Sequence, residues 1–512
     1  MEREKRRDKI ASSASRVSRN TLINFAAKVA ELAAGLITIP LATRYLGLEL
    51  FGEYAFLGAV SMVLGPTIAM GSLRILIRDM SVEREKSPLF LSSGLHLNWL
   101  MSIAVSLIAV IVIFYFNLTS KNAVLCLYIA LLGQVLKSMK NTIDSVFIAY
   151  EKMIYIFITT IINKVLYVTF LVLAIYYDTG IIGLFLSIAI SNGAAFIFTL
   201  AVSSIKFAKP QWGINFRQVK YLFMESLPVA VAVLIMQGYT YTNVFLLKIY
   251  QSNAHVSLFQ APQRVINPLF LLPTSFLMAF VPSLSRLGSD SDTDQDSRQG
   301  LLYAYTTTMK YMLIVTLPIA VYTTVSSGWI VNLLFGKEFS ESARSFQLIM
   351  WTIIPLFANA LLTFLLTSIR RQKVLTISSS ICFITNCILA YILVPKYGHV
   401  GASIAYLIAY YVLFLVNFYY TTKYLELIPV RRISIRPLFA GGIMLLMLLL
   451  LVNKLNMFVL SVTAFLLYFG LLFALKAFTP EEIRIFKKAF SRESKGRQRR
   501  GPGPEMPDSS IE

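Results

Sequence analysis

Long apolar runs recur from one end of the chain to the other, and short polar stretches separate them. A run of about 20 apolar residues crosses roughly 30 Å of hydrocarbon as an α-helix. The pattern therefore predicts about fourteen transmembrane helices. Their expected ranges are 21–43, 51–73, 89–116, 123–148, 154–177, 181–204, 222–250, 255–285, 301–334, 344–368, 374–394, 399–422, 438–453 and 457–477.

The composition supports an all-α integral membrane protein. Of the 512 residues, 56% are hydrophobic and only 14% are charged, with a mean hydropathy of +0.67. A soluble domain carries more charge and less apolar surface than this.

Basic residues are distributed unequally between the two sides of the expected membrane. With fourteen crossings, the even-numbered connections and both tails hold 33 Lys and Arg, and the odd-numbered connections with the span ends beside them hold 7. Cytoplasmic loops carry such an excess, so we expect both termini in the cytoplasm and the protein in the cell membrane. The net charge of +21 then reflects topology and not nucleic-acid binding. The basic start of the chain also lacks the pattern of a cleavable signal peptide.

Motifs for enzymatic chemistry are missing from the sequence. Cys126, Cys382 and Cys387 fall inside expected spans, where packing is their expected role. The histidines are far apart in sequence, and there is no phosphate-binding loop, metal-ligand cluster or nucleophile motif. The outer connections are short, which disfavours a membrane glycosyltransferase or polymerase. We expect a protein that is not an enzyme and has no cofactor or metal.

Two halves of the chain resemble each other. YYDTGIIGLFLSIAIS and PKYGHVGASIAYLIAYY pair Gly180 with Gly398 and Gly183 with Gly401, an offset of 218. An earlier pair, RYLGLELFGEYAFLGA and KIYQSNAHVSLFQAPQ, is offset by 205, and a longer loop near 285–300 accounts for the difference. Parallel repeats of six spans enclose a central cavity and work by alternating access.

These features divide the chain into seven expected segments. They are a basic cytoplasmic N-terminus (1–20), a first six-helix bundle (21–204), a cytoplasmic linker (205–221), a second six-helix bundle (222–422), a cytoplasmic loop (423–437), two additional helices (438–477) and a cytoplasmic tail (478–512). The tail begins with TPEEIRIFKKAF, which predicts an amphipathic helix on the membrane surface, and continues as a disordered basic segment.

Several motifs carry a family resemblance. LPVAVAVL opens the seventh span, FVPSLSRL closes the eighth, LLFGKEFSESARSFQLI follows the ninth, and PKYGHVGASIAYLI joins the eleventh and twelfth. With twelve spans in two halves plus two more, the chain resembles the polysaccharide transporters, in the superfamily that also holds multidrug and toxin extrusion pumps and lipid II flippases. It looks like a flippase for lipid-linked O-antigen or capsule repeat units.

The resemblance implies a V-shaped pair of bundles with the substrate passing between them. That substrate is a polyprenyl-pyrophosphate-linked oligosaccharide, and a polysaccharide polymerase and chain-length proteins are the implied partners besides membrane lipid. Many relatives have an aspartate in the seventh span where this chain has Asn243, so no role of that acid is carried over.

Charged residues inside the expected spans are the candidate functional groups. Charges in hydrocarbon are costly, so they must face water, a partner or a ligand. Cations exceed acids, which suits an anionic pyrophosphate. The candidate head-group ligands are Lys28, Lys137, Lys140, Lys164, Arg264 and Lys310, and the candidate acids for coupling to H⁺ or Na⁺ are Glu31 and Asp144.

Helical spacing places several of these groups on common faces. Thr21, Asn24, Lys28, Glu31, Gly35 and Thr38 share one arc of the first span, and Gln134, Lys137, Lys140, Asn141 and Asp144 share one side of the fourth. Simpler roles stay open: Lys28 and Glu31 could neutralise each other, Lys310 could extend toward the membrane surface, and Arg74, Arg78 and Asp79 could anchor the second span.

The sequence thus predicts a flippase that moves a lipid-linked oligosaccharide from the cytoplasmic to the outer leaflet. A lipid II flippase would follow the same charge logic. A multidrug antiporter of the same fold would carry acidic cavity residues, because its ligands are cations. A scaffold without transport activity would not need unpaired charges at depth.

Overall fold

The computed structural model describes residues 2–478, apart from 70, 117–120, 212, 270–272, 274–294, 370 and 426–428. Within this part of the chain every regular element is a helix, which confirms the all-α prediction. The elements are α1 (Glu2–Ala69), α2 (Leu73–Val82), η1 (Arg84–Lys86), α3 (Ser87–Tyr115), α4 (Lys121–Ala149), α5 (Met153–Tyr176), α6 (Gly180–Lys206), α7 (Phe216–Tyr250), α8 (Asn253–Leu269), α10 (Gln295–Phe335), η2 (Lys337–Phe339), α11 (Ser342–Trp351), α12 (Ile353–Ser368), α13 (Gln372–Tyr424), α14 (Val430–Leu451) and α15 (Met457–Ala474).

Two of the helices are each a pair of helices joined at a glycine. In α1 the break is at Gly47 (φ 68°), and in α13 it is at Gly398 (φ 54°). A positive φ is accessible to glycine at little cost, so the chain can reverse there without a loop. The two breaks separate the first expected span from the second and the eleventh from the twelfth.

The number of membrane crossings is supported only in part. The described residues contain 11 helices long and apolar enough to cross a membrane, and α1 and α13 are two of these. The eighth expected span, 255–285, begins in α8 but extends beyond the described residues, so the count of fourteen stays a prediction. The expected amphipathic helix in the tail also lies outside the part of the chain that the structure describes.

The pairing of glycines between the halves has a structural counterpart. Gly180 begins α6 with φ 62°, and its partner Gly398 has φ 54°. A Cβ at Gly183 would lie 1.7 Å from the Thr179 hydroxyl, and one at Gly401 would lie 2.3 Å from the Leu393 carbonyl oxygen. Gly180 and Gly398 thus share a positive φ, and Gly183 and Gly401 both lie too close to a neighbouring atom for a Cβ to fit without a shift.

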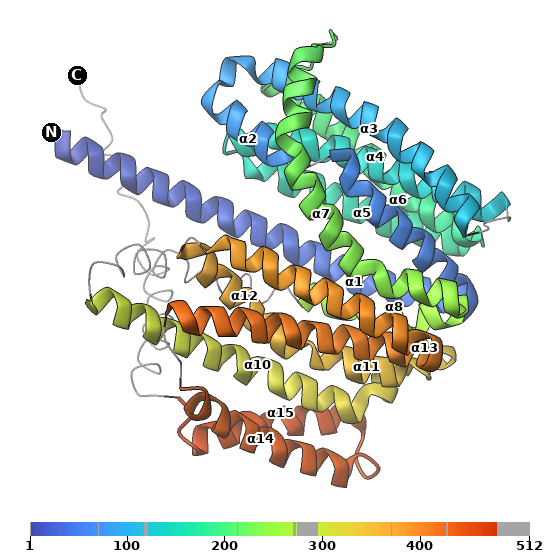
Figure 1. The fold of residues 1–512 in the computed structure, drawn as a ribbon, viewed down its shortest axis with the longest axis vertical. Helices are drawn as coiled ribbons and strands as arrows, with labels where there is room; N and C mark the ends of the chain where they lie inside the picture. The colour runs from blue at the N-terminus through green and yellow to red at the C-terminus, as the bar shows by residue number, and fades with distance from the viewer. Residues whose placement is uncertain are drawn as a thin grey trace, which may run out of the picture.

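The turns of both halves meet at one end of the molecule, which we call the Gly47 end. Arg44 donates a hydrogen bond to the Leu333 carbonyl at 2.5 Å, across the two halves. Gly52 packs against the backbone of Asn253, where an added Cβ would lie 1.9 Å from the carbonyl oxygen. The Ser257 hydroxyl also donates to the Leu48 carbonyl. Figure 1 shows the helices of the two halves converging toward this end.

The opposite end, which we call the Arg78 end, is tied together differently. Arg78 forms an ion pair with Asp79 at 2.8 Å and donates to the Tyr221 hydroxyl at 2.8 Å. These contacts join α2 to the start of α7, in agreement with the expected anchoring role of Arg78 and Asp79. Helix α7 packs near its start against α2 and α3 and near its end against α1, α8 and α13, so it contacts both halves.

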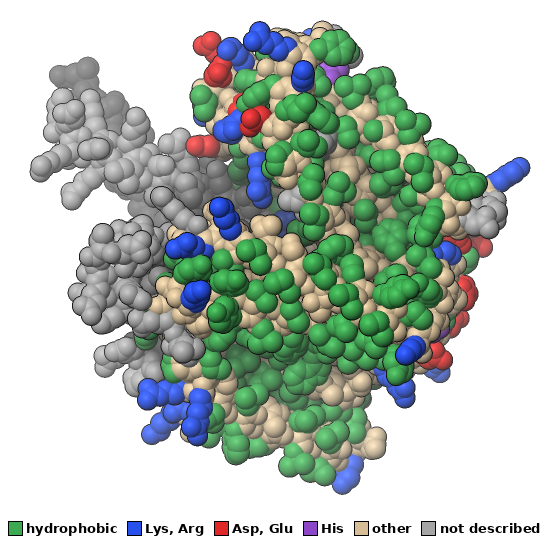
Figure 2. Space-filling model, in the orientation of Figure 1, with side chains coloured by type: hydrophobic (Ala, Val, Ile, Leu, Met, Phe, Trp, Pro, Cys, Tyr) green, Lys and Arg blue, Asp and Glu red, His purple; other side chains and the backbone are tan. Residues whose placement is uncertain are grey.

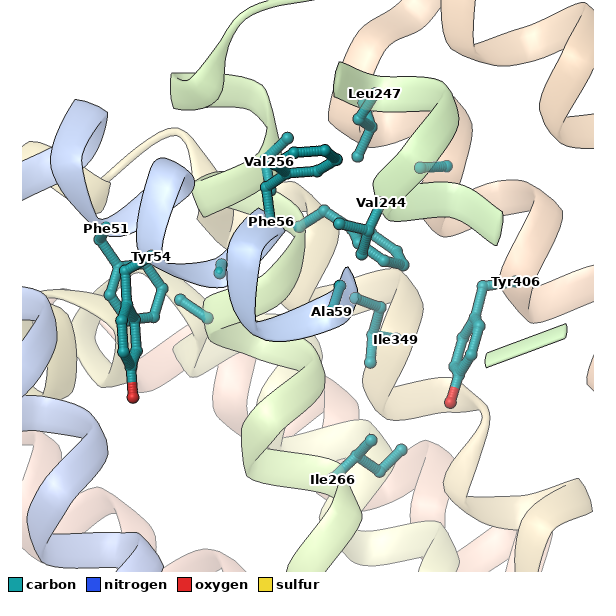
Figure 3. Packing of buried hydrophobic residues seen from close by; sticks show 14 of the residues in the cluster. Phe51, Tyr54, Phe56, Ala59, Val244, Leu247, Val256, Ile266, Ile349 and Tyr406 are labelled. Atoms are coloured by element: carbon teal, nitrogen blue, oxygen red, sulfur yellow. The ribbon is translucent and has the colours of Figure 1, made fainter. Parts of the chain in front are cut away.

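The largest hydrophobic cluster joins the two halves near the Gly47 end. Figure 3 shows Phe56 and Ala59 of α1 among Val244 of α7 and Val256 of α8. A second cluster packs α14 and α15 against α10, where the buried Tyr468 donates to the Ile314 carbonyl at 3.1 Å. Hydrophobic side chains cover the broad middle of the outer surface in Figure 2, and charged side chains gather toward its edges, as a membrane requires.

The close approach of α1 and α8 generates a prediction about stability. Gly52→Val forces a side chain against the Asn253 backbone, and overpacking of this kind costs about 1–3 kcal/mol. We expect a lower midpoint of thermal unfolding for the purified variant in detergent. Gly35→Ala, in the same helix, is the control, because no atom lies within 4 Å of its added Cβ. Equal midpoints for the two variants would contradict the proposed tight contact.

Candidate functional site

A cavity of about 420 Å³ lies between the two halves. Helices α1, α4, α5 and α6 of the first half line it, together with α7 and α8 of the second half. A central cavity between two related halves is the feature that the repeat pattern predicts.

Five of the eight predicted site residues line this cavity. They are Glu31 of α1, Lys137 and Lys140 of α4, Lys164 of α5 and Arg264 of α8. Four cations therefore face one carboxylate, a formal surplus of three positive charges among the lining residues. The cavity gives these groups the contact with water or a ligand that charges at membrane depth require.

Lys140 is held by a buried ion pair. Its Nζ lies 2.7 Å from Oδ2 of Asp144, and the side chains are 14% and 9% exposed. Asp144 does not line the cavity, and its Oδ1 has no hydrogen-bond partner among the described residues. In this arrangement Asp144 neutralises Lys140, whereas Lys137 is exposed and has no ion pair within the described part of the chain.

Glu31 is shared between its neighbour and the cavity lysines. Its Oε2 lies 2.7 Å from Nζ of Lys28, one turn away on α1. Lys137 and Lys164 are also close enough to interact electrostatically with this carboxylate. Lys28 itself is more than half exposed and does not line the cavity. Both hypotheses for this pair therefore have a basis, since Lys28 and Glu31 are paired and Glu31 faces the cavity.

Arg264 rests on aromatic rings instead of a carboxylate. Its guanidinium carbon lies 5.1 Å from the ring centroids of both Phe51 and Tyr54. Such cation–π contacts stabilise a charge without neutralising it. The charge of Arg264 is therefore available to the cavity.

Lys310 lies away from the cavity. Its Nζ donates to the carbonyl of Ala477 at 3.2 Å, just beyond the end of α15, and it also lies over the ring of Tyr311. Arg436 donates to the neighbouring carbonyl of Lys476 at 2.6 Å. Cations are stabilising at helix C-termini, where carbonyl groups lack partners. The geometry favours a structural role for Lys310 in holding α15.

The sequence identified Gln134 and Asn141 of the cavity lining but not several other uncharged polar residues. Asn163 donates to Asn192 at 2.9 Å, and Asn192 donates to the Gly133 carbonyl at 3.0 Å, so the two amides join α4, α5 and α6. Gln260 and Gln263 of α8 also line the cavity. Helical spacing could have identified these residues, because polar side chains recur every three or four residues next to a charged one. The two sets are Thr160, Asn163, Lys164 and Tyr167 on α5, and Gln260, Gln263 and Arg264 on α8.

Other polar groups inside the second half are paired with one another. Asn243 donates to Asn386 at 3.2 Å in a fully buried position. His255 and His399 lie next to each other at the Gly47 end, with their Nδ1 atoms 3.0 Å apart, although they are far apart in sequence. Within the described residues no group of three or more His, Cys, Asp or Glu could hold a metal.

The helices, the breaks and the central cavity together define a multi-pass membrane protein with a transporter fold. Residues 17–288, more than half of the chain, match the family of polysaccharide biosynthesis proteins. The chain therefore belongs to this family, which confirms the resemblance drawn from its sequence.

Two curated relatives match shorter parts of the chain. A protein of Shigella flexneri named "Putative O-antigen transporter" is 24% identical over 199 residues, which are 38% of this chain and 45% of that protein. "Uncharacterized membrane protein MJ1068" of Methanocaldococcus jannaschii is 26% identical over 129 residues, 25% of each chain. The matched regions thus span less than half of the length of these relatives.

Solved structures show the same fold over most of the chain. "Lipid II flippase MurJ, inward closed conformation" has a TM-score of 0.69 and 19% identity, covering 89% of this chain and 98% of that one. An outward-facing multidrug resistance MATE family transporter of the MOP superfamily has a TM-score of 0.55 and 13% identity, covering 80% and 95%. The relatives with a functional name are transporters or flippases, in agreement with the expectation that this chain is not an enzyme.

The buried ion pair generates a second prediction. Lys140→Met leaves the Asp144 carboxylate buried without its cation, which costs about 3 kcal/mol or more in the free energy of unfolding. The double variant Lys140→Met with Asp144→Leu should recover most of that loss, because well-packed apolar residues can replace a buried pair.

Thermal unfolding of the purified variants in detergent measures this difference. Lys137→Met is the control on the same helix, since Lys137 is exposed to the cavity and its loss should change stability little. A single Lys140→Met variant as stable as the native protein would show that the pair does not hold α4 in place.

Proposed function

We propose that this protein is a flippase for polyprenyl-pyrophosphate-linked oligosaccharide repeat units, such as those of O-antigen, capsule or exopolysaccharide. The observation that carries the proposal is the charge of the cavity, in which four cations face one carboxylate. A pyrophosphate supplies the negative charge that balances this excess of cations. Membership in the polysaccharide biosynthesis family supports the same class of substrate.

The head group binds among Lys137, Lys140, Lys164 and Arg264 in this proposal. Lys137 and Lys164 are the principal ligands, because Lys140 is already paired with Asp144. Glu31 faces the same lysines and keeps the empty cavity from carrying its full positive charge. An arriving pyrophosphate takes over part of that role.

The orientation follows from the distribution of Lys and Arg. With both termini in the cytoplasm of the cell, the Arg78 end is cytoplasmic and the Gly47 end faces outward. The contacts between the halves at the Gly47 end close the cavity toward the outside. Transport then requires these contacts to open while the halves approach each other at the Arg78 end.

Two other transport functions share the fold. A lipid II-type flippase is the nearest alternative, since the fold is similar to that of MurJ and the same cations would suit its pyrophosphate. A multidrug antiporter is disfavoured, because four cavity cations repel a cationic drug. Competition between short-chain lipid-linked substrates in the transport assay below distinguishes the two flippases.

Removing the cavity lysines should stop transport. Lys137→Gln with Lys164→Gln removes two charged hydrogen-bond donors, each worth about 1.5–3 kcal/mol, so we expect transport to fall at least about tenfold. The measurement is transfer of a radiolabelled polyprenyl-pyrophosphate-linked oligosaccharide across proteoliposomes. Lys310→Gln is the matched control, because Lys310 of α10 contacts the chain just beyond α15 and does not line the cavity. A double variant with the normal rate would overturn the proposed head-group site.

The energy source is proposed to be an ion gradient acting through Glu31 and Asp144. Each acid has a lysine partner at 2.7 Å, so binding of H⁺ or Na⁺ competes with an ion pair. Glu31→Gln and Asp144→Asn should each abolish the dependence of transport on an imposed H⁺ or Na⁺ gradient. If both variants respond to the gradients as the native protein does, coupling through these acids is wrong.

A further inference from the structure

The cavity is not uniform along its length. With a rise of 1.5 Å per residue, Tyr54 lies about 10 Å from Gly47 along α1, and Tyr241 lies about 14 Å from Tyr250 at the end of α7. By the same measure Lys137 lies about 24 Å from the start of α4, and Glu31 lies about 24 Å from Gly47. Tyr54 and Tyr241 therefore lie toward the Gly47 end, and Glu31 and Lys137 lie toward the Arg78 end. Lys164, about 18 Å from the end of α5, lies between them.

The part near the Gly47 end has aromatic walls. The ring centroids of Tyr54 and Phe185 lie 4.9 Å apart. The guanidinium carbon of Arg264 lies 5.1 Å from the ring centroid of Tyr54. Tyr167 and Tyr241 line the same cavity from α5 and α7. A tyrosine offers an apolar face together with a hydroxyl group, the combination that suits a ring-shaped polar ligand.

The same part contains two buried amides. Gln260 and Gln263 line the cavity and are only 4% and 2% exposed. The side chain of Gln263 also contacts the hydroxyl of Tyr406 in α13, which holds this amide in position. A glutamine amide has two N–H donors and an acceptor oxygen, so one contact leaves hydrogen-bonding capacity for a polar group in the cavity.

We propose that these side chains form a glycan subsite for the first sugars of the lipid-linked head group, separate from the lysines that bind its pyrophosphate. The subsite consists of Tyr54, Tyr167, Tyr241, Gln260 and Gln263, and Arg264 remains with the lysines in the pyrophosphate site. This inference rests on the proposed function and divides its head-group site into two parts.

The chemistry of the two parts matches the two parts of the ligand. Sugar hydroxyls both donate and accept hydrogen bonds, as do glutamine amides and tyrosine hydroxyls, whereas phosphate oxygens at neutral pH mainly accept. Lysines are therefore suited to the phosphates, and the amides and tyrosines to the sugars. The five side chains of the subsite, three tyrosines and two glutamines, are uncharged at neutral pH. The sugars contacting it are accordingly neutral pyranoses, whose apolar faces pack on the tyrosine rings.

The order along the cavity is also consistent with loading. The sugars occupy the closed Gly47 part, the pyrophosphate remains among Lys137, Lys140 and Lys164, and the polyprenyl chain stays toward the Arg78 end. When a head group enters the cavity from the Arg78 end, its sugars enter first and its phosphates enter last.

The test compares two probes on the purified full chain in detergent. One is citronellyl pyrophosphate, and the other is the same compound carrying a single glucose, galactose or N-acetylglucosamine on the pyrophosphate. Isothermal titration gives the gain in affinity that each sugar adds. We expect at least one sugar to tighten binding about tenfold in the native protein, from a few added hydrogen bonds and ring packing.

The variants assign that gain to one part of the cavity. Gln263→Leu should remove most of the sugar-dependent gain and leave the affinity for citronellyl pyrophosphate within about twofold, since it alters only neutral hydrogen bonding. Lys137→Gln should weaken both probes by a similar factor. Tyr241→Leu removes a ring from the half-buried wall and should act like Gln263→Leu, which provides a second variant if the first does not fold.

Each remaining outcome overturns a definite statement. If the native protein binds citronellyl pyrophosphate but no sugar adds affinity, the glycan subsite is wrong and the proposed function stands. The subsite is also wrong if Gln263→Leu and Tyr241→Leu weaken both probes equally. If neither probe binds to the folded native protein, the proposed function itself fails, and the subsite fails with it.

Discussion

The cost of a charged side chain at membrane depth is the constraint on which the rest of this structure depends. Such a group must meet water, a counter-charge or a ligand. The protein meets this requirement in three ways: Lys140 pairs with Asp144 inside the first half, Arg264 lies over two aromatic rings, and Lys137 and Lys164 face a cavity. The cavity between the halves thus allows Lys137 and Lys164 to remain charged within the membrane.

The two halves contribute unequally to that cavity. The three cavity lysines and Glu31 belong to α1, α4 and α5, whereas the second half provides Arg264, two glutamines and parts of α7. The halves are joined at the Gly47 end by close backbone packing, as between Gly52 and Asn253. Helix α7 contacts both halves along its length. A change of access to the cavity must therefore alter the contacts of α7 together with those of the Gly47 end.

Much of the fold and part of the site could be predicted from the sequence. Apolar runs identify the helices, and helical spacing places Glu31, Lys137 and Lys140 on polar faces that the cavity does contain. The same spacing cannot say which neighbouring helix a face meets. Lys310 shows this limit, because its partner is a carbonyl 167 residues away at the end of α15. The adjacency of His255 and His399, and the link between Asn163 and Asn192, arise in the same way from helix packing.

By itself the sequence determined that the chain is an all-helical membrane protein with repeated halves and a surplus of intramembrane cations. These properties depend on composition, run length and period, which are local to each segment. Only the tertiary structure decided which cations share a cavity and which are neutralised. It also decided that Tyr54, Tyr241 and Gln260 lie nearer the Gly47 end of the cavity than Lys137 does. The physical reason is that side chains on six different helices converge there, and their distances are set by how the helices pack and not by their order along the chain.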